Sequence, residues 1–104
     1  MAHFAPGTRA LRTLTAAGKH LSFTRAADEV GLTPAAVSFQ IKEIEDQLGV
    51  KLFTRTSRTM RLTEAGTVLY EAAVDALDIM GRAVSKAQKA SRGTAQLKVS
   101  VSPH

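Results

Sequence analysis

The most restrictive feature of this sequence is a strong helix-start signal at residues 33–34. Thr33 has a hydroxyl that can accept a hydrogen bond from a free amide of the first turn, and Pro34 fits the first helical position, where no N–H is needed. Apolar residues then recur at steps of four, three and four: Val37, Ile41, Ile44 and Leu48. This spacing predicts a helix with one buried face, which Gly49 terminates.

A second, shorter helix is predicted immediately before this one, over residues 25–30. Thr24 is its expected N-cap, and Gly31 ends it, because glycine tolerates the left-handed backbone of a sharp turn. Ala27 is small enough for the two helices to cross closely, and Val37 can fill their junction. The pair is therefore interpreted as a helix-turn-helix, with a plain helical hairpin of a bundle as the alternative.

An arm and one further helix are predicted before this pair. Residues 1–7 are interpreted as a flexible arm, broken by Pro6 and Gly7. A helix then begins after Thr8, whose hydroxyl can cap it, and ends near Gly18. Its apolar stripe consists of Leu11, Leu14 and Ala17.

A basic β-hairpin is predicted after the helix-turn-helix. Two short apolar segments, residues 50–53 and 60–62, flank a polar tip. Between Gln47 and Thr63 there is no acidic residue but there are four basic ones: Lys51, Arg55, Arg58 and Arg61. A basic hairpin beside a helix-turn-helix favours nucleic-acid binding over a plain bundle, because it supplies contacts to phosphates.

A long helix is predicted over residues 64–92, even though it contains Gly66 and Gly81. Its apolar stripe consists of Ala65, Leu69, Ala72, Ala76, Met80, Ala83 and Ala87. A small three-helix core cannot cover so long a stripe, so we expect a second copy of the chain to cover the remainder. Acidic residues crowd the first half of this helix and basic residues the second, which would let two antiparallel copies pair opposite charges.

The last residues, 93–104, are interpreted as a hinge followed by the start of another domain. Arg92, Gly93 and Thr94 form the expected hinge, and residues 96–102 alternate as a strand would. A single terminal strand has no sheet to join. We therefore expect it to be the first strand of a domain that this chain does not include.

The composition favours a polyanionic partner and argues against several other classes. The formal net charge is +5, which suits nucleic acid or an anionic membrane surface, although an ordinary basic protein has the same charge. The chain has no cysteine, which excludes disulfides and thiolate metal sites. No long apolar run or signal peptide is present, so a cytoplasmic location is expected. The three histidines are scattered, so neither a metal site nor a cofactor is predicted.

The stretch from Leu21 to Gly66, LSFTRAADEVGLTPAAVSFQIKEIEDQLGVKLFTRTSRTMRLTEAG, resembles the N-terminal domain of LysR-type transcriptional regulators. The segments SFTRAA, AAVSFQIKEIEDQLGVKLF and LTEAG carry the resemblance, which extends from about Leu11 to Gly66. It implies a mainly α fold: a winged helix-turn-helix (three helices plus a two-stranded β-hairpin wing) followed by a long dimerisation helix. The winged domain would span residues 8–63, with the helix-turn-helix at about 23–42, and the linker helix residues 64–92.

The resemblance also implies which residues contact DNA. The third helix would lie in the major groove and present Thr33, Pro34, Ala35, Ser38, Phe39 and Lys42. The wing would contribute Arg55, Thr56 and Arg58, and the start of the second helix Ser22 and Thr24, mainly to the backbone. Many family members have Gln in place of Pro34, and Arg or His in place of Phe39. Direct hydrogen bonding to bases is therefore expected to be sparse, with methyl contacts and DNA shape contributing more.

The function that follows is a sequence-specific DNA-binding transcriptional regulator that binds pseudo-palindromic promoter sites as a dimer. The resemblance implies a tetramer in an intact protein, a possible contact with RNA polymerase, and a small-molecule effector bound by a C-terminal domain outside this chain. A non-specific architectural binder and a protein-interaction module are the alternatives. An enzyme is the least supported class, because no nucleophile–base pair, phosphate loop or metal-ligand spacing is found.

Overall fold

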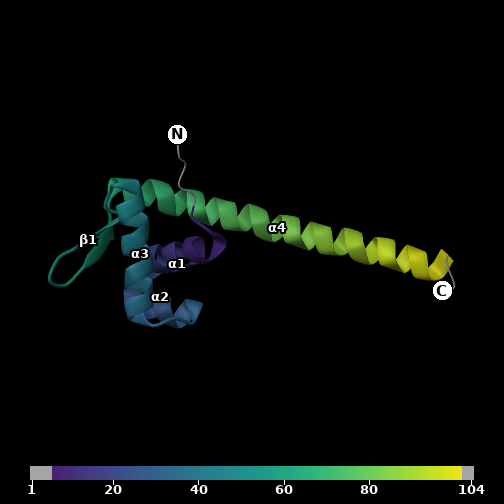
Figure 1. The fold of residues 1–104 in the computed structure, drawn as a ribbon, viewed down its shortest axis with the longest axis horizontal. Helices are drawn as coiled ribbons and strands as arrows, with labels where there is room; N and C mark the ends of the chain where they lie inside the picture. Colours follow the sequence, from purple (N-terminus) through teal and green to yellow (C-terminus); the bar gives the residue numbers. More distant parts are fainter. Residues whose placement is uncertain (1–5, 102–104) are drawn as a thin grey trace.

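The computed structural model describes the backbone of residues 6–101 and the side chains of residues 6–92. Its elements in chain order are α1 (Thr8–His20), α2 (Phe23–Val30), α3 (Pro34–Leu48), β1 (Phe53–Arg55), β2 (Met60–Leu62) and α4 (Glu64–Val101). The first three helices and the hairpin form a small body, and α4 extends far beyond it (Figure 1). The predicted mainly α fold of three helices, hairpin and long helix is therefore confirmed. Most of the predicted N-terminal arm, residues 1–5, lies outside the described residues.

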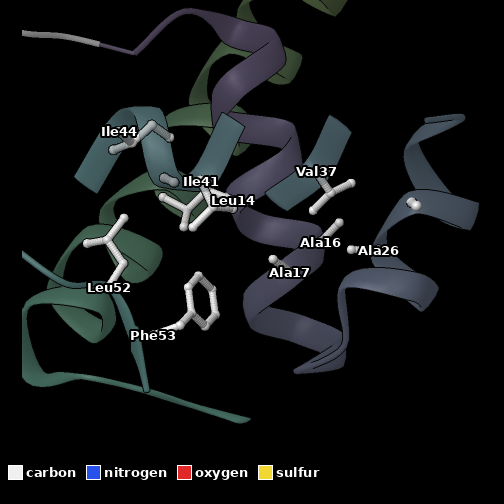
Figure 2. Close-up of a cluster of buried hydrophobic side chains, with 11 residues drawn as sticks. Leu14, Ala16, Ala17, Ala26, Val37, Ile41, Ile44, Leu52 and Phe53 are labelled. Carbon is white, nitrogen blue, oxygen red and sulfur yellow. The ribbon is translucent and has the colours of Figure 1, made fainter. Parts of the chain in front are cut away.

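The core lies where α1 crosses the other helices. Figure 2 shows Leu14, Ala16 and Ala17 of α1 among residues of α2, α3 and the hairpin. The buried apolar residues are Leu14, Ala16, Ala17, Ala26, Ala27, Val37, Ile41, Ile44, Leu52, Phe53 and Ala73. Four of these eleven are alanines from α1 and α2, so the helix backbones approach closely. The apolar stripes predicted for α1 and α3 thus meet in the core, except for Leu48 at the end of α3, which is 39% exposed.

Two predicted helix caps are wrong, because a neighbouring residue takes the position. Ser22, and not Thr24, is the N-cap of α2, and its hydroxyl accepts a hydrogen bond from the Arg25 amide at 3.2 Å. Gly7 takes the N-cap position of α1 without any side-chain hydrogen bond, which leaves Thr8 inside the first turn. The actual caps thus lie two residues before Thr24 and one residue before Thr8.

Gly18 does not end α1, as the sequence had predicted, but lies inside it. The helix continues to His20 and ends at Leu21, which adopts the left-handed conformation with φ 50°. A Cβ at residue 18 would overlap the ring of Tyr70 in α4. Glycine is therefore needed here for a close approach between α1 and α4, and Tyr70 is a packing residue.

An ion-pair cluster joins the end of α1 to α2. Glu29 Oε1 lies 2.9 Å from Lys19 Nζ and 2.7 Å from His20 Nε2. The hydrogen bond from Lys19, followed by that from His20, holds the pKa of the Glu29 carboxyl below its ordinary value. Because the cluster is exposed to solvent, we assign it a minor part in stability.

The hairpin is fixed to α3 by one buried carboxylate. Glu45 Oε2 accepts hydrogen bonds from the amides of Leu52, at 2.7 Å, and Phe53, at 3.3 Å. The Glu45 side chain is only 10% exposed, whereas its sequence neighbours Glu43 and Asp46 are exposed. Glu45 therefore holds the entry into β1.

The start of α4 is fixed to the same segment. The Thr63 hydroxyl accepts a hydrogen bond from the Gly66 amide at 2.9 Å and donates one to the Lys51 carbonyl, while the Thr63 amide donates to the Leu52 carbonyl at 2.9 Å. A Cβ at residue 66 would overlap the Leu52 carbonyl oxygen. Gly66 is therefore required by packing, although the sequence showed only its cost in helix propensity.

The hinge and strand predicted after residue 92 are wrong over the described residues. The backbone of α4 remains helical to Val101. A helix satisfies its own backbone hydrogen bonds, whereas a strand over residues 96–102 needs a partner strand. Gly93 lowers the stability of a helix by about 1 kcal/mol relative to alanine, which is too little to interrupt a helix of 38 residues.

We expect Gly66→Ala to destabilise the fold, while Gly81→Ala, in the same helix, stabilises it. Alanine normally gains about 0.5–1 kcal/mol over glycine in a helix, and nothing lies within 4 Å of a Cβ at residue 81. At residue 66, the overlap with a backbone oxygen reverses the sign, with a net loss of about 2 kcal/mol. Urea unfolding checks both values, and equal effects of the two substitutions would contradict the close contact.

We expect Glu45→Gln to lower the free energy of unfolding by about 1–3 kcal/mol, because the two amide hydrogen bonds lose their charged acceptor. The matched control is Glu43→Gln, an exposed position on the same helix, which should change it by less than about 0.5 kcal/mol. Amide hydrogen exchange should also show faster opening at Leu52 and Phe53 in the Glu45 variant alone. Unchanged protection there would refute the anchoring role.

Candidate nucleic-acid interface

The turn between α2 and α3 has the geometry that the sequence predicted. Gly31 adopts φ 73° and ψ 34°, and its amide and that of Leu32 both donate to the Ala27 carbonyl. Ala27 and Val37 are buried at the junction. This backbone is strained for any residue with a Cβ, so Gly31 fixes the angle at which α3 leaves the turn.

The first turn of α3 is held by its predicted cap. The Thr33 hydroxyl accepts a hydrogen bond from the Ala36 amide at 3.1 Å, and Pro34 occupies the first turn. The hydroxyl proton of Thr33 remains available for donation to a ligand. This end of α3 is solvent-exposed over residues 33–35, so it can approach another molecule.

The exposed face of α3 brings together the residues predicted for the recognition helix. Ala35, Ser38, Phe39 and Lys42 follow one another at steps of three, one and three and lie on one side of the helix. All four are exposed, and the Phe39 side chain is 65% exposed. The opposite side carries Val37, Ile41 and Ile44 into the core (Figure 2).

A cleft lies between this face of α3 and the hairpin. Ser38 and Lys42 line it from α3, and Lys51, Thr54 and Arg55 line it from the hairpin segment. Three cationic side chains therefore surround one opening, and the Glu45 carboxylate below it is engaged by backbone amides. Such a cleft suits a phosphate group of a polyanion.

Lys51 is a member of this cleft that the sequence did not assign to the site. It was counted in the basic run of the hairpin, but only the packing of β1 against α3 shows which of those cations face the helix. Its Nζ also lies 3.9 Å from Glu45 Oε1. The local excess of basic residues in the sequence indicates that Lys51 could bind a polyanion. It does not indicate that Lys51 lines a cleft.

Arg55 is oriented by aromatic packing. Its guanidinium lies 4.9 Å from the centre of the Phe23 ring, and that ring meets the Phe53 ring edge to face at 5.7 Å. The stacked guanidinium keeps its hydrogen-bond donors available at its edge. The two phenylalanines thus link α2 to β1 and hold a cation beside the cleft.

The wing residues have different roles at the hairpin tip. Thr56 closes the tip: its amide donates to the Thr59 carbonyl at 2.8 Å, and its hydroxyl lies 2.7 Å from the Thr59 hydroxyl. Thr56 was predicted to contact DNA, but its hydroxyl is already engaged in this turn. Arg58 lies exposed within the tip and can reach outward. The strands pair antiparallel, with Phe53 opposite Leu62 and Arg55 opposite Met60.

The two hydroxyl residues predicted at the start of α2 also differ. Ser22 is occupied as a cap, while Thr24 is exposed in the first turn. Phe23, between them, lines the cleft. Of the two predicted residues, Thr24 is the more accessible, and neither lines the cleft itself.

The described part of the chain shows neither a metal-ligand cluster nor a membrane-spanning helix. It contains no group of three or more His, Asp or Glu side chains placed to hold a metal ion. None of its helices combines the length and the hydropathy needed to cross a bilayer.

Comparisons with known proteins agree with this geometry. A family model described as bacterial regulatory helix-turn-helix protein, lysR family, matches residues 8–67. The glycine cleavage system transcriptional activator of Escherichia coli K12 is 59% identical over 61 residues, which cover 59% of this chain and 20% of that protein. The transcriptional activator AmpR of Pseudomonas aeruginosa is 49% identical over 69 residues, 66% of this chain and 23% of that protein. The chain thus spans about a fifth of the length of these relatives.

Solved structures show the same architecture. The DNA-binding domain of BenM, in a complex with benA site 1 DNA, superposes with a TM-score of 0.79 at 32% identity, covering 85% of this chain and 99% of that one. The DNA-binding domain of CbnR in a DNA complex gives a TM-score of 0.75 at 27% identity, covering 83% and 99%. The chain therefore belongs to the LysR family of bacterial regulatory helix-turn-helix proteins.

Proposed function

We propose that this chain is the DNA-binding part of a transcriptional regulator and that it binds double-stranded DNA at specific sequences. The observation that carries the proposal is the exposed face of α3 beside a cleft with three cations, Lys42, Lys51 and Arg55. The family relationship and the DNA complexes of its structural neighbours support it. We attribute no catalytic role to the chain, and we expect it to act in the bacterial cytoplasm.

The major groove is the expected position of α3. An α-helix fits this groove, and its N-terminal residues then face the base edges. Thr33, Ala35 and Ser38 would face the bases, while Lys42 would reach a phosphate. Arg55 and Arg58 on the hairpin would contact the backbone or the adjacent minor groove.

Dimerisation through α4 is the second part of the proposal. The first turns of α4 already contact the domain: Ala73 is buried in the core, and Leu69, which the sequence assigns to the seam, is partly buried against it. Beyond the core Ile79 and Met80 are exposed, as is Val68 nearer the start of the helix. Together with the predicted Ala72, Ala76, Ala83 and Ala87, and with Ala65 at the start, they give an apolar seam for an antiparallel partner.

Ile79 is a seam residue that the sequence interpretation did not include. It is 58% exposed and is separated from Ala72 by seven residues and from Ala83 by four, so it shares a side of the helix with both. An intact protein built like its relatives would add a C-terminal effector-binding domain, contacts with RNA polymerase and a tetrameric assembly. The dimer on its own would place two α3 helices on the two halves of a pseudo-palindromic site.

Selection of bound duplexes from a random library, at two salt concentrations, tests sequence specificity. We expect an inverted repeat to be enriched and to persist at the higher concentration, because contacts with bases depend less on salt than contacts with phosphates. Binding that enriches no sequence and is lost as salt rises would replace the regulator with a non-specific binder.

The same assay tests the hairpin. Arg55→Ala combined with Arg58→Ala should weaken binding to all sequences. It should reduce the slope of log K against log salt by about 3.6 for a bound dimer, since each of the four lost phosphate contacts contributes about 0.9. Arg82→Ala combined with Lys89→Ala removes the same charge from exposed positions of α4 and is the matched control. An equal slope for the two double variants would refute the assignment of the wing.

Ile79→Asp should convert a dimer to a monomer, because it places a charge in the apolar seam. Gln88→Asp adds the same charge nine residues further on, on the opposite side of α4, and should leave the dimer intact. Sedimentation velocity at equal protein concentrations compares the two. If both variants dimerise like the parent chain, α4 does not pair through this side.

A further inference from the structure

We propose that the recognition surface reads the C5 methyl groups of pyrimidines in the major groove, and that Phe39 determines this specificity. The inference rests on the DNA-binding function proposed above and names the feature of the DNA that the site selects. The inference starts from the exposure of Phe39, which has the largest apolar side chain on the exposed face of α3 and is 65% exposed. Leaving a phenylalanine in water forfeits the free energy of burying it, which suggests that a ligand covers it.

The surface around Phe39 is poor in hydrogen-bonding groups. Pro34 and Ala35, which precede it on the exposed part of α3, have no polar side-chain atom. Thr33 is oriented by its 3.1 Å hydrogen bond from the Ala36 amide. Ser38 offers one hydroxyl, and Lys42 belongs to the cationic cleft. The surface can therefore form few direct hydrogen bonds with base edges.

The major groove presents one kind of apolar group to such a surface. Base edges there display hydrogen-bond donors and acceptors, except for the C5 methyl of thymine, and 5-methylcytosine carries the same methyl at the same ring position. A phenylalanine placed against guanine N7 and O6 would leave both acceptors without water or a partner, which is unfavourable. The ligand chemistry that complements Phe39 is therefore a pyrimidine methyl group.

The charges beside Phe39 favour DNA over an apolar protein partner. Ser38, its neighbour in the chain, lines the cleft that holds Lys42, Lys51 and Arg55. An apolar partner seated on Phe39 would have to approach these three cations and displace their water, at a cost in free energy. In DNA the same cations would meet phosphates, while the phenylalanine reaches the groove between them.

The experiment uses the 104-residue chain and the inverted repeat obtained by selection. Each thymine of a half-site is replaced in turn by deoxyuridine, which removes the C5 methyl and nothing else. We expect Kd to rise about fourfold at one position or more in each half-site, the effect of exposing one buried methyl-sized group. Where cytosine replaces a sensitive thymine, its C5 methylation should lower Kd by a similar factor.

Two variants assign the effect to Phe39. Phe39→Ala should abolish the response to both base modifications, whereas Phe39→Leu, which keeps an apolar side chain, should retain it. Because Phe39 is exposed, neither substitution should shift the urea midpoint of unfolding, and this is measured alongside. A methyl response that persists in Phe39→Ala would refute the role of this residue.

The outcomes separate this inference from the function on which it rests. If the chain selects a site but every deoxyuridine substitution leaves Kd unchanged, methyl reading is wrong and the sequence-specific regulator stands. If selection enriches no sequence, the proposed function fails and methyl reading fails with it.

Discussion

A single buried carboxylate relates the two parts of the interface to each other. Glu45 belongs to α3, the helix that carries the exposed stripe, and its Oε2 accepts hydrogen bonds from the amides of Leu52 and Phe53, where the hairpin begins. In a buried site such charge-assisted bonds resist competition from water. The separation between Phe39 on α3 and Arg55 on the hairpin is therefore set by hydrogen bonds and core packing instead of a loose connection. The exposed face of α3 and the hairpin can contact one DNA duplex together only if this separation is kept.

Sequence patterns predicted those features whose causes lie within a few residues. The cap at Thr33, the turn at Gly31 and the apolar spacing of α3 all depend on neighbours within one or two turns, and all three are confirmed. Errors arose where two residues close in the sequence could serve equally. Ser22 and Thr24 can both cap α2, and the choice depends on where the chain leaves α1, which local sequence does not encode.

Other features have causes that lie far along the chain, and the sequence could not reveal them. Gly18 is small because Tyr70 of α4 packs over it, and Gly66 because the Leu52 carbonyl lies against it. From neighbouring residues alone, Gly18 is expected to end its helix, and Gly66 is expected only to lower the helix propensity of α4. For the candidate site, periodicity found the exposed face of α3, and the basic run found the hairpin. The cleft itself, with Lys51 in it, required the packing of one against the other.

The long helix α4 connects the candidate nucleic-acid interface to the proposed dimer seam. At about 1.5 Å per residue, its 38 residues extend about 57 Å, well beyond the small body from which it starts (Figure 1). Its first turns are not free to rotate on that body, because Thr63 and Gly66 hold them to the hairpin segment and Tyr70 packs on α1. Any change in how two such helices pair would therefore move α3 as part of a rigid unit. In the proposed dimer, close packing at two glycines would thus convert the arrangement of the helices into the spacing of the two α3 surfaces, without requiring any change inside either domain.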